Sequence, residues 1–360
     1  MKLAIVADWL VTYGGAEHTI AEFLKVWPLS PLYTTVARPG SLGPLRNEKI
    51  ITSRLQMLYG ITGKHQPLLP LMPRAIESLD LRGYDVILSS SHAVAKGIIP
   101  PSGARHVCYC HTPMRYAWEM ENEYLDDFRV PRFLRKTVQA QLRRIRRWDL
   151  STAKRVDTFI ANSHETRRRI ETIYGRDATV IHPPADDRFF DAPLLPMRDR
   201  TSFVAVGRLV PYKRYDLLIQ TANALKLPLT IAGRGQEEKR LRAMAGPTVT
   251  FLGFVSEHDL PSLYARAKAV LFAPYEDAGI VPLEAQACGT PVIAFGKGGA
   301  LDTVKDGVTG TFFEAQTVEA VGAAIKRFGT MTLEPEKIRE HARQFSAERF
   351  RNSMRTAVEK

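Results

Sequence analysis

Short apolar runs alternate with helical segments along almost the whole chain, and this alternation restricts the possible folds more than any other feature. The runs rich in β-branched residues lie at 3–8, 85–90, 106–110, 158–162, 202–206, 229–232, 249–252, 269–272 and 291–295. Strands that are separated by helices predict a parallel sheet with helices packed on both faces. We therefore predict an α/β fold.

A stretch rich in proline, aspartate and arginine separates the chain into two halves. It follows Pro183 and Pro184 and ends near residue 200. A chain of 360 residues exceeds the size at which a single core usually stops growing, so two domains are expected. We predict two doubly wound, Rossmann-like domains at residues 1–185 and 201–335, joined by a linker at 186–200. They should face each other across a cleft, with ligands at the carboxyl ends of the strands.

Two carboxylates mark a candidate site in the second half. Glu276 and Glu284 stand eight residues apart around Gly279, after the apolar run at 269–272. Glu276 would lie in a loop and Glu284 one turn inside the next helix. The N-terminus of that helix would present the backbone N–H groups of Gly279, Ile280 and Val281. Unpaired donors and the positive end of the helix dipole attract phosphate there.

Two basic residues, Arg208 and Lys213, follow the run at 202–206. Arginine can bind phosphate oxygens in a bidentate manner, and lysine supplies a compact second cation. The alternative is an ordinary pair of exposed basic residues. Combined with the two carboxylates downstream, the pair predicts a nucleotide-sugar site.

The first half offers weaker signals. Gly14 and Gly15 follow the first predicted strand and precede a helix, so the backbone there can approach a diphosphate closely. They form neither a dinucleotide-binding glycine motif nor a P-loop. His111 ends the run at 106–110 at its carboxyl end, where a site is expected, although a buried core histidine is the alternative.

These segments together resemble the retaining glycosyltransferases of the GT-B fold, family 4, over nearly the whole chain. The runs at 111–118 and 298–304 are similar to those of bacterial mannosyltransferases that build surface polysaccharide, either O-antigen or exopolysaccharide. One departure is Ala278, which occupies a place where the family commonly has an aromatic residue. The resemblance also implies that residues 336–360 form a helical segment that crosses back to the first domain.

The resemblance implies a role for each candidate. Glu284 would accept hydrogen bonds from the ribose, Glu276 would hold sugar hydroxyls, His111 would lie against the donor sugar, and the backbone at Val255 would meet the base. The implied catalytic residues are His111, Arg208, Lys213 and Glu276, and the implied donor-binding residues are Gly14, Gly15, Arg208, Lys213, Val255, Gly279, Ile280, Val281 and Glu284. The candidates for acceptor binding are Tyr13, Arg115, Tyr116 and Trp118, for which packing is an equal alternative.

The implied reaction is the transfer of mannose from GDP-mannose to a lipid-linked oligosaccharide, with retention of anomeric configuration. A UDP- or ADP-sugar donor is an alternative, and so is an inactive sugar-nucleotide sensor. We expect no cofactor and no metal, because the set His106, Cys108, Cys110 and His111 lacks the usual ligand spacing. The three cysteines are too few and too odd in number for a disulfide framework, so they should be core residues.

A basic helix is expected at 129–155, within a chain of net charge +12. Between residues 128 and 148 no acidic residue interrupts the basic ones, which are Arg129, Arg132, Arg135, Lys136, Arg143, Arg144, Arg146 and Arg147. Apolar residues follow helical spacing within the same run. The helix has either an ordinary solvated face or one that contacts anionic lipid. Nucleic-acid binding is the third reading, but no recognised module is present.

No apolar run is long enough to span a bilayer, and residues 1–8 read as a strand and not as an export signal. We therefore expect a cytoplasmic protein, peripheral at the inner face of a bacterial inner membrane. Residues 66–73 are apolar but interrupted by three prolines, so neither helix nor strand is expected there. They should form a surface loop that either packs inward or exposes an apolar patch.

Overall fold

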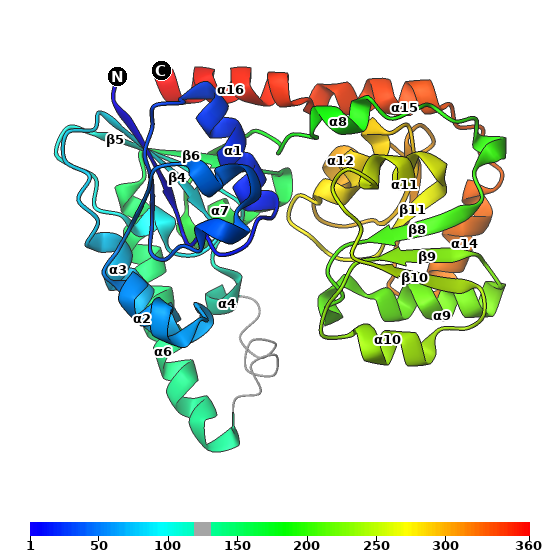
Figure 1. The fold of residues 1–360 in the computed structure, drawn as a ribbon, viewed down its shortest axis with the longest axis horizontal. Helices are drawn as coiled ribbons and strands as arrows, with labels where there is room; N and C mark the ends of the chain where they lie inside the picture. The colour runs from blue at the N-terminus through cyan, green and yellow to red at the C-terminus, as the bar shows by residue number, and fades with distance from the viewer. Residues whose placement is uncertain (119–130) are drawn as a thin grey trace. The chain divides into compact units, whose positions relative to one another are not determined.

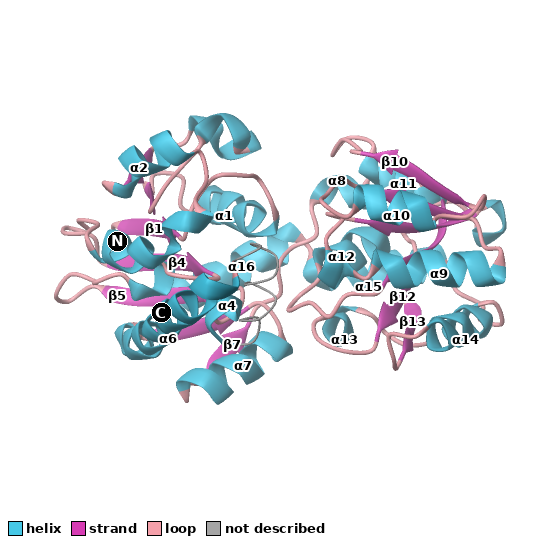
Figure 2. Ribbon diagram, turned by 90° about the horizontal axis from the view of Figure 1, so that it is seen from below, coloured by secondary structure: helices cyan, strands magenta, loops and turns pink. Residues whose placement is uncertain are grey.

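The computed structural model describes residues 1–118 and 131–360. These residues form two compact units (Figure 1). Unit 1 contains Met1–His182 and Arg351–Lys360, and unit 2 contains Pro183–Phe350. Each unit is a parallel sheet with helices on both faces (Figure 2), which confirms the predicted fold class.

Unit 1 has a seven-stranded sheet in the order β3-β2-β1-β4-β5-β6-β7. Its strands are β1 (Leu3–Ala7), β2 (Leu32–Thr34), β3 (Ile50–Thr52), β4 (Val86–Ser91), β5 (Arg105–Cys110), β6 (Thr158–Ala161) and β7 (Ala178–Val180). Its main helices are α1 (Gly15–Val26), α2 (Leu55–Thr62), α3 (Met72–Glu77), α4 (Arg115–Trp118), α6 (Arg132–Thr152) and α7 (His164–Tyr174). Because the strand order reverses between β1 and β4, the switch point of this sheet lies there.

Unit 2 has a six-stranded sheet in the order β10-β9-β8-β11-β12-β13, with the equivalent reversal between β8 and β11. Its strands are β8 (Ser202–Val206), β9 (Leu229–Ala232), β10 (Val249–Gly253), β11 (Ala267–Phe272), β12 (Val292–Phe295) and β13 (Gly310–Phe313). Its helices are α8 (Asp187–Phe190), α9 (Tyr215–Leu225), α10 (Glu238–Met244), α11 (Leu260–Arg266), α12 (Ile280–Ala287), α13 (Ala300–Thr303), α14 (Val318–Phe328), α15 (Pro335–Ala342) and the start of α16 (Ala347–Glu359).

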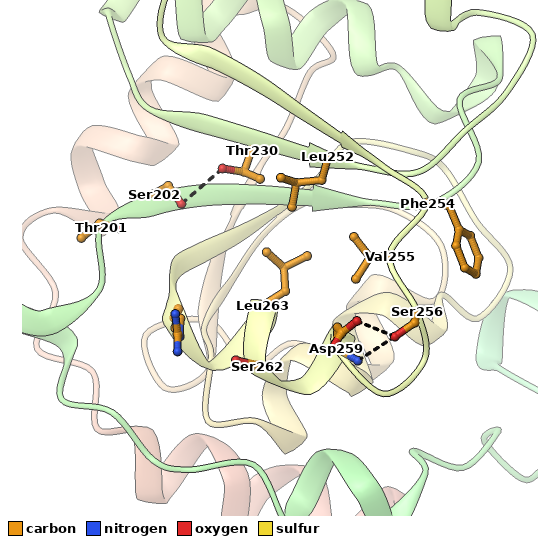
Figure 3. Close-up of a pocket in the computed structure, with 11 residues that line it drawn as sticks. Thr201, Ser202, Thr230, Leu252, Phe254, Val255, Ser256, Asp259, Ser262 and Leu263 are labelled. Carbon is orange, nitrogen blue, oxygen red and sulfur yellow. Dashed lines mark hydrogen bonds between the residues drawn. The ribbon is translucent and has the colours of Figure 1, made fainter.

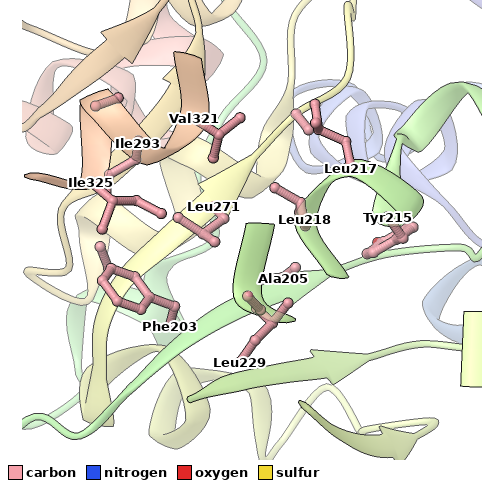
Figure 4. Close-up of a cluster of buried hydrophobic side chains, with 14 of the residues drawn as sticks. Phe203, Ala205, Tyr215, Leu217, Leu218, Leu229, Leu271, Ile293, Val321 and Ile325 are labelled. Atoms are coloured by element: carbon pink, nitrogen blue, oxygen red, sulfur yellow. The ribbon is translucent and has the colours of Figure 1, made fainter. Parts of the chain in front are cut away.

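The core of unit 2 shows why its strands read as continuous apolar runs. Leu271 packs under α9 and α14, with Leu218 and Val321 beside it (Figure 4), whereas its neighbours Val270 and Phe272 belong to the cluster on the opposite face. Successive side chains of a strand point to opposite faces, so both sets must be apolar when helices cover both.

Two segments differ from the expectation. Residues 186–200 are not a free linker but part of unit 2: they contain α8, and the buried Arg200 donates to Thr290 Oγ1 at 2.7 Å and to Leu195 O at 2.9 Å. Residues 66–73 are helical, as η3 (Gln66–Leu71) followed by α3, because Leu68, Leu69 and Met72 are buried.

The end of the chain belongs to both units. Residues 351–360 of α16 are assigned to unit 1, where Arg351 Nη1 pairs with Glu22 Oε2 at 2.6 Å and Arg105 Nη2 donates to Ala357 O at 3.1 Å. Helix α15 packs on α12 and lies in unit 2. Within the described ranges, a helix with both the length and the apolar character needed to cross a bilayer is not found.

Candidate functional site

The loops that follow β8 and β9 lie backbone against backbone. Gly207 N donates to Ala232 O at 3.0 Å, and a Cβ on Gly233, whose φ is +146°, would overlap the carbonyl of Gly207. This close approach requires glycine. Arg208 follows directly and is exposed, and its guanidinium forms no hydrogen bond or ion pair with the described part of the chain. It is therefore available to an anionic ligand.

Lys213 ends the short helix η7 (Pro211–Lys213), and its Nζ pairs with Oε1 of Glu276. The two side chains are only 12% and 17% exposed. Burial lowers the pKa of Lys213, but the charges of Glu276 and Tyr212 and the hydrogen bond to Glu276 together outweigh it, so the pKa is raised. Lys213 is therefore a fixed cation, and the loops after β8 and β11 are joined at the switch point of unit 2.

The loop that carries Glu276 rests on a pair of glycines. Gly299 N donates to Glu276 O at 2.9 Å, and a Cβ on Gly298 would overlap that same oxygen. A Cβ on Gly299 would overlap Cα of Ala278. In the sequence, Gly298 and Gly299 stood out only through the family resemblance. In the structure, they support this loop by close backbone contact.

We expect Gly298→Ala to weaken nucleotide binding by about tenfold or more, because the new methyl group must push the Glu276 loop out of place. Gly307→Ala is a matched control, since Gly307 has a similar φ of +74° and open space around its Cβ position. In both variants an alanine must adopt the left-handed backbone conformation, which costs about 1–2 kcal/mol. Equal nucleotide affinities of the two variants, measured by calorimetry, would contradict the supporting role.

Glu284 lies in α12, one turn past its start, as the sequence predicted. Its Oε2 accepts a hydrogen bond of 2.8 Å from the hydroxyl of the buried Tyr264. Burial raises the pKa of Glu284 above its ordinary value, although Tyr264 and Arg188 oppose the shift. Arg188 comes from α8 and also donates to Glu257 Oε2 at 2.6 Å. Arg188 was not among the predicted site residues because it lies in the expected linker.

The start of α12 has the geometry that the sequence predicted for phosphate binding. Gly279, at φ +72°, is the residue before Ile280 and Val281, and none of the side chains that the structure describes caps this end. The first N–H groups of a helix have no partner within the helix. They are thus available beside the Lys213–Glu276 pair, on the loop that leads from Glu276 to Glu284.

Val255 lies in the loop after β10, at one end of a pocket of about 580 Å³ in unit 2. Leu252, Leu263 and Val255 point into this pocket (Figure 3), which extends to Ser202 at the start of β8. Its lining includes none of the charged candidates. We therefore place the candidate site at the loops described above and not at this pocket, which shares only Val255 with it.

In unit 1, Gly14 and Gly15 lie at the start of α1, as predicted, but a carboxylate is already there. Oε2 of Glu17 is 3.4 Å from the position of a Cβ on Gly14. Burial raises the pKa of Glu17, and the N–H groups of Glu17 and Gly14 counteract it. A diphosphate at these glycines would have to approach Glu17, and their role as donor contacts stays a prediction.

His111 follows β5, half-buried, with its Nε2 2.8 Å from Oγ of Ser90. Burial and the charge of His92 lower its pKa to about 3, so it is neutral at physiological pH. The nearby His106 bonds through both ring nitrogens, to Ser89 Oγ and Arg155 O, while Cys108 and Cys110 are buried free thiols. These three are core residues in this structure.

The acceptor candidates lie on two segments, Tyr13 before α1 and the other three on α4. Trp118 Nε1 donates to Asp149 Oδ2 at 2.8 Å and the guanidinium of Arg146 lies 5.2 Å from its ring, so Trp118 packs α4 onto α6. Tyr13 places its hydroxyl 3.4 Å from Nδ1 of His18. Arg115 begins α4, and the side chain of Tyr116 lies outside the described residues.

Two parallel α/β units, each with helices on both faces of its sheet, define the fold class. HepE of Anabaena, solved in complex with UDP, has the same architecture, with a TM-score of 0.72, 18% identity and complete coverage of both chains. Sucrose-phosphate synthase of Thermosynechococcus elongatus gives a TM-score of 0.73 at 18% identity, over 99% of this chain and 98% of that one. The fold is GT-B.

Sequence comparison gives the family. Residues 13–189 match the model of glycosyltransferase family 4, and residues 186–345 match that of the group 1 glycosyl transferases. The chain belongs to the family 4 glycosyltransferases of the GT-B fold.

Curated relatives match only in part. The chain is 33% identical over 211 residues to the GDP-mannose-dependent alpha-(1-6)-phosphatidylinositol monomannoside mannosyltransferase of Mycolicibacterium smegmatis. This alignment covers 51% of this chain and 54% of the relative. It is 33% identical over 186 residues to a D-inositol 3-phosphate glycosyltransferase of Mycobacterium tuberculosis, covering 45% of this chain and 38% of the relative. The match therefore spans about half or less of these proteins.

Proposed function

We propose that the protein is a retaining glycosyltransferase that moves mannose from GDP-mannose to a lipid-linked oligosaccharide in bacterial polysaccharide biosynthesis. The observation that carries the proposal is the buried Lys213–Glu276 pair beside the unpaired Arg208. Mannose and GDP are suggested by the name of one relative, whereas HepE was solved with UDP and UDP-glucose. A UDP- or ADP-sugar is therefore the alternative donor.

In the proposed reaction the bond between the anomeric carbon and the β-phosphate oxygen breaks, and the acceptor oxygen bonds to that carbon on the same face. The acceptor proton passes to the leaving phosphate, so no protein base is required. Arg208, Lys213 and the N–H groups at the start of α12 would offset the charge that grows on the phosphate. Glu276 would hold the sugar hydroxyls and balance the positive ring, and no metal or cofactor is part of the proposal.

Calorimetric titration with GDP, UDP and ADP tests the site and the donor together. We expect GDP to bind selectively, and Glu284→Ala to weaken binding by about tenfold to a hundredfold through lost hydrogen bonds to the ribose. Glu340→Ala removes an exposed carboxylate of unit 2 and serves as the control. Preference for UDP or ADP would replace the donor, and binding without turnover on any acceptor would favour a sensor. No binding would overturn the site.

The same proposal includes peripheral contact with anionic lipid at the cytoplasmic face of the membrane. Arg143, Arg144 and Arg147 are exposed on α6, and Phe133 near its start is 80% exposed. On α2, Met57 and Ile61 are 71% and 83% exposed. Arg129 lies outside the described residues. Exposed apolar side chains next to exposed cations are the combination that an acidic bilayer surface binds.

Vesicle flotation tests this contact. We expect the protein to float with phosphatidylglycerol vesicles and not with phosphatidylcholine vesicles, and Arg143→Glu with Arg147→Glu to reduce binding by about tenfold or more, at about 1 kcal/mol per charge. Lys239→Glu with Lys326→Glu makes the same charge change on exposed sites of unit 2. Equal loss of vesicle binding in both double variants would contradict a specific contact by α6, because net charge alone would then explain the binding. Salt-dependent retention on DNA without lipid binding would favour the nucleic-acid alternative.

A further inference from the structure

Both sheets carry an ion pair at the point where the strand order reverses. In unit 2 the pair joins Lys213, after β8, to Glu276, after β11. In unit 1, Asp8 directly follows β1 and His92 directly follows β4, and Asp8 Oδ2 lies 2.9 Å from His92 Nδ1. In open α/β sheets, ligands bind outside the carboxyl ends of the strands at such a switch point. The pair in unit 1 therefore occupies the position where a ligand is expected.

Asp8 is held more firmly than packing requires. Its side chain is fully buried, yet it accepts backbone hydrogen bonds from His92 at 2.7 Å and Ala93 at 3.2 Å, and further ones from Val94 and Ala95. Burial alone would raise the pKa of Asp8, but the charge of His92 and these donors lower it. A buried carboxylate with this many donors stays ionised and cannot turn.

His92 leaves one polar atom for a ligand. Its Nδ1 faces Asp8, and its ring packs edge to face with Trp9 at 4.7 Å. The side chain is 26% exposed, and Nε2 has no hydrogen-bond partner among residues 1–118 and 131–360. Since Asp8 and Trp9 fix the ring, Nε2 has a defined direction at the carboxyl edge of the sheet.

The groups around His92 indicate what kind of ligand it takes. Asp8, which follows β1, and Glu17 of α1 raise the pKa of His92 against the effect of burial, which favours the doubly protonated ring with a proton on Nε2. The pKa values of His65, before η3, and His111, after β5, are lowered to about 4 and about 3, so both rings are neutral. A phosphate bound here would face the carboxyl groups of Asp8 and Glu17 with His92 as the single cation, which is electrostatically unfavourable. A sugar hydroxyl can accept from Nε2–H and donate to Glu17, so it is the better match.

We propose that His92, positioned by Asp8, is a sugar-binding residue of unit 1 whose Nε2–H donates a hydrogen bond to a hydroxyl of the acceptor sugar. This proposal rests on the proposed function. It extends that function because Asp8, His92 and Glu17 are not among the residues that the sequence assigned to acceptor binding.

The test is nitrogen NMR of the histidine rings in the full-length protein, with methyl α-mannoside as the probe. We expect both ring nitrogens of His92 to be protonated at neutral pH, and its Nε2 resonance to shift when the sugar is added. His258, whose side chain is 97% exposed, is the internal control and should not move. A response of His92 to inorganic phosphate at lower concentration than to the sugar would overturn the proposal, and so would no response to the sugar.

Two variants separate binding from folding. His92→Ala should weaken the probe by about tenfold, followed through the Trp9 indole resonance, and His92→Gln, which keeps a donor at a similar reach, should recover part of the loss. A structural role alone would predict equal probe affinity in both variants. GDP titration of the same samples reports on unit 2. If the unmodified protein bound none of GDP, UDP and ADP, the proposed function would be refuted, whereas sugar binding that survives His92→Ala would refute only this inference.

Discussion

Replacing Lys213 with methionine should slow sugar transfer by about 10²- to 10³-fold, which corresponds to roughly 3–4 kcal/mol of transition-state stabilisation. Two effects act in the same direction. The cation that faces the leaving phosphate is lost, and Glu276, only 17% exposed, is left without its partner. An unpaired carboxylate next to a departing phosphate repels the charge that develops there. The measurement is the rate of nucleoside diphosphate release from the sugar nucleotide under single-turnover conditions.

The controls distinguish chemistry from folding. Lys239→Met removes an exposed lysine of α10 and should leave the rate within a factor of about two, as surface substitutions usually do. Adding Glu276→Gln to Lys213→Met should restore stability, because no buried charge is then unpaired, but not the rate. If the double variant regained full activity, Lys213 would be only a structural partner of Glu276.

Replacing Lys96 with methionine should destabilise unit 1 by about 3–5 kcal/mol, because it leaves a buried carboxylate without its cation. Lys96 and Asp149 are 1% and 0% exposed, and Lys96 Nζ lies 2.9 Å from Asp149 Oδ1. The hydroxyl of Tyr174 also donates to Asp149 Oδ2, at 2.9 Å. The pair therefore ties the segment after β4 to α6 and α7.

Urea unfolding followed by tryptophan fluorescence measures this effect directly. All four tryptophans of the chain, Trp9, Trp27, Trp118 and Trp148, lie in unit 1, so the signal reports that unit alone. Lys154→Met, at an exposed site next to α6, is the matched control. The double variant Lys96→Met with Asp149→Leu should be more stable than Lys96→Met, since both charges are then gone. A double variant that is less stable than the single one would argue against this account.

The central strands were predictable because they are covered on both faces. β1, β4, β5, β6, β8, β9, β11 and β12 coincide with apolar runs of the sequence. The edge strand β10 also coincides with such a run, although none of its residues is fully buried. β2, β3 and β7 were missed, because strands of only three residues give no periodic signal. The four-residue edge strand β13 was missed as well. Residues 186–200 were read as a linker from their prolines, but burial of Phe189 and Arg200 fixes them to unit 2.

The candidate site was predictable as a set of chemical groups but not as an arrangement. The sequence assigned Lys213 and Glu276 to one site but did not predict their ion pair, which forms because parallel pairing of β8 with β11 brings the loops after these strands together. For Trp118 the sequence left acceptor binding and packing equally open. Its hydrogen bond to Asp149 shows that it packs α4 onto α6, and its contact with an acceptor stays a prediction.

The sequence by itself determined the fold class, the division into two halves, and the types of charged residue that follow the strands of the second sheet. These properties follow from local periodicity and composition, which any segment carries by itself. The tertiary structure alone decided which charges meet, as in the Asp8–His92 and Lys213–Glu276 pairs, and which glycines support a loop, as Gly298 does. The order of strands in a sheet sets these contacts, and strand order depends on packing between segments far apart in the chain.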